Sequence, residues 1–327
     1  MREVSSEPVL TETYPLAERF RPLEGSLYIY GTSPEDRSQH VASWRGATTN
    51  LTFVEICSET STSFKVVGKD GDFLLRSSSG LSPLFEGQAA SRIYLDITGL
   101  THSVWASLLR AALVARREVV VVYVEPNEYS RSESPVEGQI YDLSARITGI
   151  APLPGFAVLS SSSSDALFVP LLGFEGTRLR HLIEQVQPAP ERIYPVIGLP
   201  GFKTWYVFET YAGNRAALEE TGAWQSVRYA SANCPFSCFY LLTELARESP
   251  MSSMKIAMIG TKPHALGAVL FALTSPSRAE LIYDHPIRKP GRTDGTDRLL
   301  VYHVGAIASG IAAVGSASVA RSAAGDR

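Results

Sequence analysis

Cysteine is scarce in this chain of 327 residues, and the few that it has argue against two kinds of site. Cys57, Cys234 and Cys238 are odd in number and match no four-ligand zinc spacing. They therefore indicate neither a disulfide framework nor a structural metal. We expect ordinary buried thiols in a reducing compartment, with no metal and no cofactor.

Excess positive charge is also missing, since the chain has 30 Lys and Arg and 33 Asp and Glu, which gives a net charge of −3. General binding of duplex nucleic acid is therefore not expected. Residues 1–21 are charged throughout and lack the apolar run of a signal peptide. Residues 304–320 are mostly Gly, Ala, Ser, Val and Ile, and this run is short and weakly apolar for a bilayer span. We expect a cytoplasmic chain that does not enter the membrane and ends in a closing helix or a loosely ordered tail.

Two common catalytic motifs are absent from the sequence. There is no Gly-x4-Gly-Lys-Ser/Thr phosphate loop and no Gly-x-Ser-x-Gly elbow, so an ordinary ATPase, GTPase or α/β-hydrolase is not indicated. Arg298 and His303 have the Arg-x4-His spacing of HEPN ribonucleases. The residues between them are typical of a strand, whereas that motif requires a helix.

What the sequence does contain is an internal repeat. Gly31 follows the strand-like residues 27–30, and Gly173 follows residues 166–172. The next apolar run lies at the same distance from each glycine. Both copies continue into a helix that opens with Arg-x-x-His, formed by Arg37 and His40 and by Arg178 and His181.

Two further landmarks recur in the same order. Gly99 precedes one helix-like segment and Gly260 precedes another, in the runs Thr98-Gly99-Leu100-Thr101-His102 and Gly260-Thr261-Lys262-Pro263-His264. Each copy then reaches a strand that ends in an acid and a proline, at Glu125-Pro126 and at Asp284-His285-Pro286. Four landmarks in one order predict an internal duplication.

Hydrophobic periodicity predicts an α/β fold of two tandem Rossmann-like halves with mainly parallel sheets. In the first half we expect strands at 26–30, 51–57, 92–97 and 118–124, a hairpin at 63–77, and helices at 34–45 and 102–115. In the second we expect strands at 166–172, 192–198, 255–259, 280–284 and 298–304, and helices at 176–187, 203–219, 235–248 and 263–273. The predicted division is a polar leader at 1–25, halves at 26–150 and 151–304, and a terminal segment at 305–327. The segment 127–164, which contains Pro, Gly and the serine run 160–164, is predicted as the junction between the halves.

All the repeated motifs follow strands, and the loops that leave the carboxyl ends of parallel strands form the usual ligand crevice. Glycine, lysine and hydroxyl groups at a helix start suit a phosphate or another anion, and arginine suits phosphate or carboxylate. The arginines and histidines could equally pack or cap their helices. The predicted ligand-binding residues are Gly31, Arg37, Thr98, Gly99, Thr101, Gly173, Arg178, Gly260, Thr261 and Lys262.

Acid and base chemistry has three candidates, His102, Glu125 and His264. A carboxylate or an imidazole at a strand end can transfer protons or orient a ribose hydroxyl. Strand-end acids such as Asp96 and Glu125 can also cap the next element or accept hydrogen bonds from turn amides. Both interpretations stay open from the sequence.

The run Gly260-Thr261-Lys262-x-x-Ala265-Leu266-Gly267-Ala268 resembles the Gly-Thr-Lys-x-Met-x-x-Gly loop and helix of CARF domains, which sense cyclic oligonucleotides in antiphage systems. The resemblance covers fewer than a dozen residues. It implies a Rossmann-like sensor in which Thr261 and Lys262 contact ligand phosphate or ribose. Paired CARF-like domains in one chain, as in SAVED sensors, are the nearest architectural analogy.

Three functions are therefore compared. The first is a module that senses a phosphate-bearing ligand such as a cyclic nucleotide and acts through a protein partner or a homo-oligomer. The second is an enzyme that hydrolyses a phosphodiester or glycosidic bond of a nucleotide. The third is a non-catalytic adaptor of a defence complex. A sensor binds the ligand unchanged, an enzyme consumes it, and an adaptor does neither.

Overall fold

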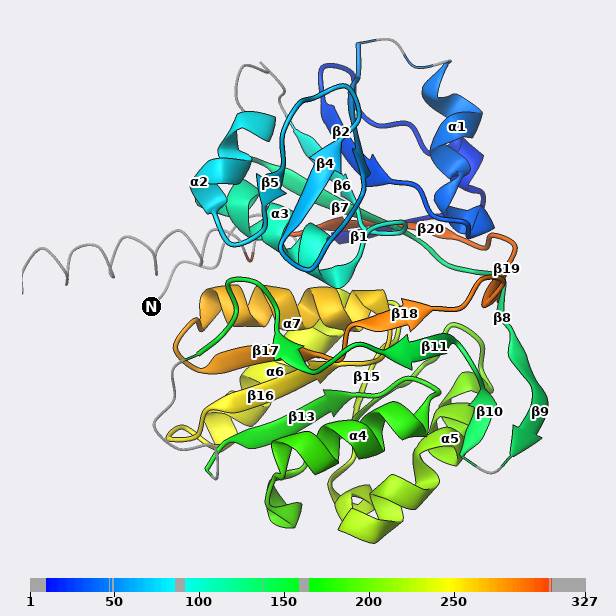
Figure 1. Ribbon diagram of the computed structural model, residues 1–327, viewed down its shortest axis with the longest axis vertical. Coiled ribbons are helices and arrows are strands. Elements are labelled where there is room, and N and C mark those ends of the chain that lie inside the picture. Colours follow the sequence, from blue (N-terminus) through cyan, green and yellow to red (C-terminus); the bar gives the residue numbers. More distant parts are fainter. Residues whose placement is uncertain are drawn as a thin grey trace, which may run out of the picture. The chain divides into compact units, whose positions relative to one another are not determined.

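The computed structural model describes residues 10–46, 48, 50–85, 92–136, 138–158, 165–305 and 307 (Figure 1). The chain forms two compact units. Unit 1 comprises residues 1–125 and 296–327, and unit 2 comprises residues 126–295. Each unit contains its own sheet, and each is described separately.

Unit 1 is built on an eight-stranded mixed sheet with the order β1-β20-β7-β6-β2-β3-β4-β5. The four inner strands β7, β6, β2 and β3 are parallel. Antiparallel β20 and β1 extend one edge, and the hairpin of β4 and β5 extends the other. The strands are β1 (Leu10–Tyr14), β2 (Leu27–Gly31), β3 (Thr52–Cys57), β4 (Ser63–Val66), β5 (Phe73–Leu74), β6 (Ile93–Asp96), β7 (Val119–Val124) and β20 (Leu299–His303).

The residue types at the centre of this sheet explain why its strands are buried there. Every residue of β7 is buried, as in a strand covered on both faces, and all but its tyrosine are valine. On one face Tyr28 packs edge-on against Trp44, and Phe20 packs edge-on against Tyr94. The helical segments of unit 1 are α1 (His40–Arg45), α2 (Ser78–Leu81) and α3 (His102–Val114), with 3-10 turns η1 (Ala17–Arg19), η2 (Asp36–Ser38) and η3 (Ser82–Leu84).

Unit 2 is built on a six-stranded sheet with the order β12-β17-β16-β13-β14-β15, in which only β12 is antiparallel to its neighbour. The strands are β12 (Ala151–Pro152), β13 (Leu167–Leu171), β14 (Val196–Gly198), β15 (Arg228–Ala230), β16 (Met254–Met258) and β17 (Ala279–Tyr283). Three two-stranded sheets join β8 (Glu128–Tyr129) to β19 (Thr293–Asp294), β9 (Arg131–Val136) to β10 (Gln139–Tyr141), and β11 (Ser144–Ile147) to β18 (Pro286–Arg288).

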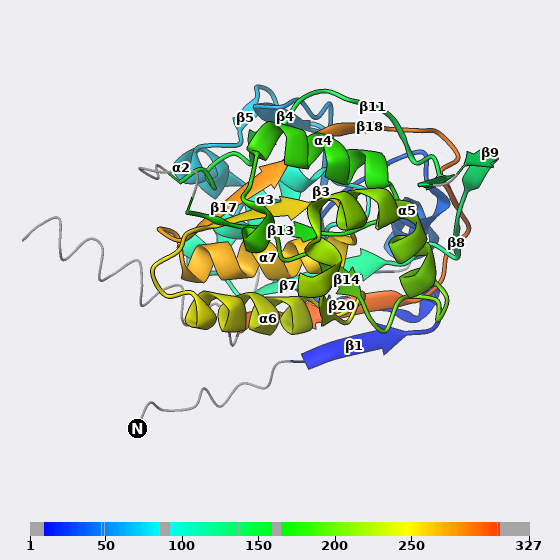
Figure 2. The same ribbon diagram turned by 90° about the horizontal axis from the view of Figure 1, so that it is seen from below.

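Helices cover both faces of the six-stranded sheet. Figure 2 shows α4 and α5 on one face and α6 and α7 on the other. The first pair buries Leu179, Leu182 and Leu218 against strand residues such as Ile197. The helical segments are α4 (Gly176–Val186), η4 (Pro190–Arg192), α5 (Tyr206–Thr221), η5 (Ala223–Ser226), α6 (Pro235–Glu248) and α7 (Lys262–Thr274).

The parallel strands have a related order in the two units. In unit 1 the order β7-β6-β2-β3 places the first strand between the second and the third. In unit 2, with β15 set aside, β17-β16-β13-β14 has the same order. The direction of winding therefore reverses beside β2 in one unit and beside β13 in the other.

The mixed α/β class is confirmed, and most of the predicted elements are present, including the hairpin within 63–77. The division of the chain differs from the predicted one. The chain leaves unit 1 after residue 125 rather than near 150 and returns at 296, because β20 pairs with β7. Strand β1 lies in the predicted leader, and the segment predicted as a junction contains β8 to β12.

Smaller differences have local causes. The predicted helix 34–45 divides into η2 and α1, where the Ser38 hydroxyl binds the carbonyl groups of Ser33 and Glu35. The cysteines are unpaired thiols, but only Cys238 is buried, whereas Cys57 and Cys234 are half-buried. The strand prediction across Arg298 and His303 is confirmed by β20.

The prediction for the terminal segment falls on residues 305–327, of which all but 305 and 307 lie outside the described residues. Among the helices of the described ranges, none is long and apolar enough to cross a bilayer.

Candidate functional site

The repeated glycines lie where two strand ends come very close together. In unit 1 a Cβ atom on Gly99 would lie 1.7 Å from the carbonyl oxygen of Gly31. In unit 2 a Cβ atom on Gly173 would lie 2.5 Å from the carbonyl oxygen of Ile259, and one on Gly260 would lie 2.6 Å from that of Leu172. The close approach of β2 to β6 in unit 1 and of β13 to β16 in unit 2 therefore requires glycine at these positions.

Arg37 is held inside unit 1 by groups of its own unit. Its guanidinium forms an ion pair with Glu35 at 2.6 Å and donates hydrogen bonds to the hydroxyl of Tyr123 at 2.8 Å and the carbonyl of Val124 at 3.3 Å. The residue is only 2% exposed. The first arginine of the repeat thus links the start of its helical region to the end of β7.

His40 and Asp96 form a buried ion pair at the end of β6. Nε2 of His40 lies 2.9 Å from Oδ2 of Asp96, and the hydroxyl of Tyr28 donates to the same oxygen at 2.9 Å. The backbone N–H of Thr98 donates to the other carboxylate oxygen. Burial opposes both charges, but the pair raises the pKa of His40 and lowers that of Asp96.

The other predicted residues of unit 1 are tied to loops and strands. The Thr98 hydroxyl accepts a hydrogen bond from the backbone N–H of Val124, and the backbone N–H of Thr101 donates to Glu59. His102 is buried in the first turn of α3. Glu125, which follows β7 and is fully buried, accepts hydrogen bonds from Arg298 at 2.9 and 3.2 Å.

Arg178 makes the corresponding link in unit 2. Its Nε and Nη2 atoms donate to the two oxygens of Asp284 at 2.6 Å each, which is a bidentate pair. Glu175 lies 3.5 Å away, and the carbonyl of Ile259 accepts a further bond at 3.4 Å. Burial opposes the charge, but Asp284 raises the pKa of Arg178. Like Arg37, this arginine connects the start of its helix with the end of the outer parallel strand.

Thr261 and His264 hold the loop after β16 against the loop after β15. The Thr261 hydroxyl accepts from the backbone N–H of His264 as the N-cap of α7 and donates to the carbonyl of Ala232 at 2.8 Å. The His264 ring is fully buried, with Nε2 3.0 Å from the carbonyl of Ser231. This burial lowers the pKa of His264 to about 4, so the ring is neutral near pH 7. Lys262 is also buried, in the first turn of α7.

A polar cavity of about 320 Å³ lies beside the start of α4. One wall comes from α4 and the turn before it, and the other comes from β10, β11 and the turn between them. The cavity is lined by Gln139, Tyr141, Asp142, Ser144, Arg146, Ile147, Glu175, Thr177, Arg178 and His181. It therefore contains both residues of the second Arg-x-x-His motif.

Some polar side chains of the lining have hydrogen-bond or ion-pair partners, and others have none. Glu175 accepts from the backbone N–H groups of Leu143 and Ser144 at 2.9 Å each, so this acid anchors the opposite wall. Asp142 is paired with Lys289. Within the described ranges, four further polar side chains of the lining have no hydrogen-bond or ion-pair partner, and these are Gln139, Arg146, Thr177 and His181.

This arrangement brings together only part of the predicted site. Arg178 and His181 line the cavity, whereas Gly260, Thr261 and Lys262 are not among its lining residues. Sequence reasoning missed Arg146, which projects from a strand inside the predicted junction. The alternation of Tyr141, Leu143 and apolar neighbours with polar residues in 139–147 was the signal available for it.

Comparison of the chain with protein-family models and with curated proteins found no match.

Proposed function

We propose that this chain is a nucleotide-binding sensor or regulatory module, and that a phosphate group of its ligand binds in the polar cavity beside α4. The observation that carries the proposal is the convergence of Arg146, Thr177 and His181, without partners in the described part of the chain, on one cavity. A guanidinium, a hydroxyl and an imidazole together supply the donors that a phosphate requires.

The surrounding charges favour an anion. Of the two acids in the lining, Asp142 is paired with Lys289, and Glu175 accepts from backbone donors and lies 3.5 Å from Arg178, which also pairs with Asp284. Arg146 forms no ion pair with either acid, so its guanidinium is available to a ligand anion. The cavity also lies at the start of α4, where the helix dipole favours negative charge.

The choice of a nucleotide rests on the repeat and on the resemblance of the Gly-Thr-Lys loop to CARF domains. The shared strand order and the matching links made by Arg37 and Arg178 support an origin by duplication of one Rossmann-like half. We include a cyclic oligonucleotide of an antiphage-type defence system as the leading ligand class. The signal would then reach a protein partner or a second copy of the chain through a shift between conformations.

The burial of the three acid and base candidates favours binding without turnover over hydrolysis. His264 is fully buried and bound to backbone carbonyl groups, and Glu125 is fully buried and bound to Arg298. His102 is 5% exposed. A proton-transfer group must reach the reacting atom, so these positions support a structural role in the described conformation.

The test is calorimetric titration of the full chain with linear and cyclic mono- and oligonucleotides, using Arg146→Gln and His181→Gln as site variants. Arg180→Gln is the matched control, because Arg180 lies on the same helix and is exposed in a pair with Glu220. We expect at least one compound to bind the native chain and the control equally. Arg146→Gln should weaken it by about tenfold, the effect of one lost charge-assisted contact. Equal affinity in all four proteins would reject the site.

A further inference from the structure

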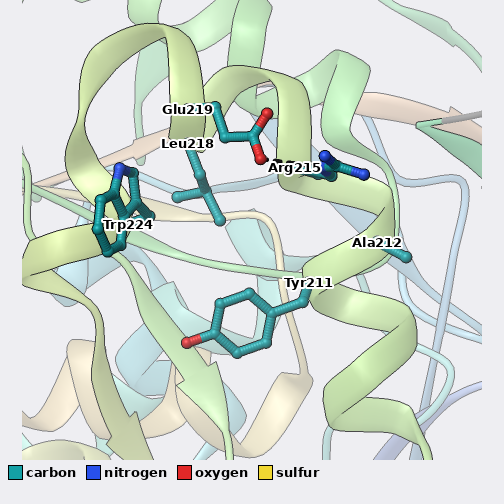
Figure 3. A pocket seen from close by; sticks show the side chains of 6 residues that line it. All are labelled: Tyr211, Ala212, Arg215, Leu218, Glu219 and Trp224. Carbon is teal, nitrogen blue, oxygen red and sulfur yellow. Dashed lines mark hydrogen bonds and ion pairs between the residues drawn. The ribbon is translucent and has the colours of Figure 1, made fainter.

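A second hollow lies on the outer surface of α5 and shares no lining residue with the polar cavity. Its volume is about 560 Å³, within the range of small-molecule sites. Figure 3 shows its walls, which come from α5 and the following turn η5. The lining residues are Tyr211, Ala212, Arg215, Leu218, Glu219 and Trp224.

Two aromatic rings form the walls, and a hydrogen bond holds one of them in place. Figure 3 shows the rings of Tyr211 and Trp224 with Leu218 between them. The Tyr211 hydroxyl is 2.5 Å from that of Tyr229. Burial and this hydrogen bond raise the pKa of Tyr211 to about 12, so the ring is uncharged at neutral pH.

Trp224 presents its indole to solvent although its neighbours are anchored. The residue is 55% exposed, whereas Ala223 beside it is 2% exposed and belongs to the hydrophobic core of unit 2. Leu218, at the floor, belongs to the same core. The hollow thus has a floor that belongs to the hydrophobic core and a wall formed by a large aromatic side chain that is more than half exposed.

The rim carries a donor and an acceptor side by side. Nε of Arg215 donates to Oε1 of Glu219 at 2.9 Å, and both side chains are more than half exposed (Figure 3). An exposed pair of this kind is weak, so its groups can exchange partners at little cost. A ligand edge with both a donor and an acceptor can therefore replace this contact.

We infer that this hollow binds a planar heteroaromatic compound whose edge carries both hydrogen-bond donors and acceptors, as a purine base does. The ring stacks on Trp224 and Tyr211. Glu219 accepts from the N–H groups of the ligand edge, and Arg215 donates to its carbonyl or ring nitrogen. The inference does not depend on the proposed phosphate site, because the two hollows share no residue.

The experiment is two-dimensional NMR of the ¹⁵N-labelled full chain, observing the indole N–H groups of its four tryptophans during titration with guanosine. Guanosine lacks phosphate, so it does not test the polar cavity. Trp224→Ala identifies one indole signal, and Trp205→Ala is the matched control because Trp205 is 48% exposed and lies outside the hollow. Purine riboside, which has the ring without exocyclic groups, is the comparison ligand.

We expect guanosine to shift the Trp224 signal saturably and to leave the Trp205 signal in place. Trp224→Ala should lower the affinity at least about fivefold, as for one lost base-stacking contact, and Trp205→Ala should not change it. Glu219→Gln should reduce the preference for guanosine over purine riboside. A non-saturable shift of the Trp224 signal would overturn the inference, as would an unchanged affinity of Trp224→Ala for guanosine, read from the backbone amide signals of the lining residues in the same spectra. Equal affinity for the two nucleosides in the native chain would overturn the role of the rim.

Discussion

The bidentate pair between Arg178 and Asp284 should be the largest single electrostatic contribution to the stability of unit 2. Asp284 has no exposed surface, and both its oxygens accept from Arg178 at 2.6 Å. Asp284→Asn keeps the side-chain volume and one acceptor oxygen but removes the charge. Arg178 would then keep one hydrogen bond to the remaining oxygen of residue 284 and the carbonyl of Ile259 at 3.4 Å, with Glu175 at 3.5 Å as its charged partner.

Removing one partner of a buried ion pair costs about 3–5 kcal/mol. Because some contacts remain, we expect Asp284→Asn to lower the free energy of unfolding by less than this, about 2–3 kcal/mol. For a unit of this size the midpoint of thermal unfolding should fall by about 4–12 °C. Circular dichroism during heating measures this midpoint. Glu220→Gln is the control, because it removes an exposed ion pair with Arg180 and should change the free energy of unfolding by no more than about 0.5 kcal/mol. A midpoint for Asp284→Asn that matches the control would refute this reasoning.

Three other substitutions test the interior contacts. The His264 pKa of about 4 lies below its ordinary value of about 6.5, so the unfolded chain takes up the proton first. About 3 kcal/mol of stability should therefore be lost as the pH falls from 6.5 toward 4, and urea titrations of His264→Gln should lack this loss. Thr261→Val removes the N-cap of α7 and should lower the free energy of unfolding by about 1–2 kcal/mol in the same titrations; no change would exclude the cap. Gly99→Ala places a methyl group against the carbonyl of Gly31 and should prevent unit 1 from folding, as judged by circular dichroism. Gly46→Ala, which has open space around it, should fold normally.

The parallel framework was predictable because its residues carry local signals. Strand β7 is a continuous run of buried valines with one tyrosine, and α7 begins with a threonine N-cap followed by Lys262 and a proline. Such patterns depend on neighbours in the sequence. The glycines at the strand ends were also recognisable, although the structure explains them by close backbone packing.

The strands and contacts that were not predicted depend on partners far away in the sequence. Strand β1 is short and pairs with β20, almost the whole chain apart. Strand β11, which carries Arg146, pairs with β18 after more than a hundred intervening residues. No local pattern shows that this strand faces α4. The pairing of Arg178 with Asp284 also joins residues that are more than a hundred positions apart. The acid at a strand end, repeated in both halves, was a usable signal for it.

The most direct test of the central claim is mass spectrometry of the full chain incubated with a panel of linear and cyclic nucleotides, measuring both the retained ligand and the products. The native protein should retain at least one phosphate-bearing compound intact, and Arg146→Gln should release it. Conversion of the compound into products would contradict the sensor function, and retention by the variant at the native level would contradict the site.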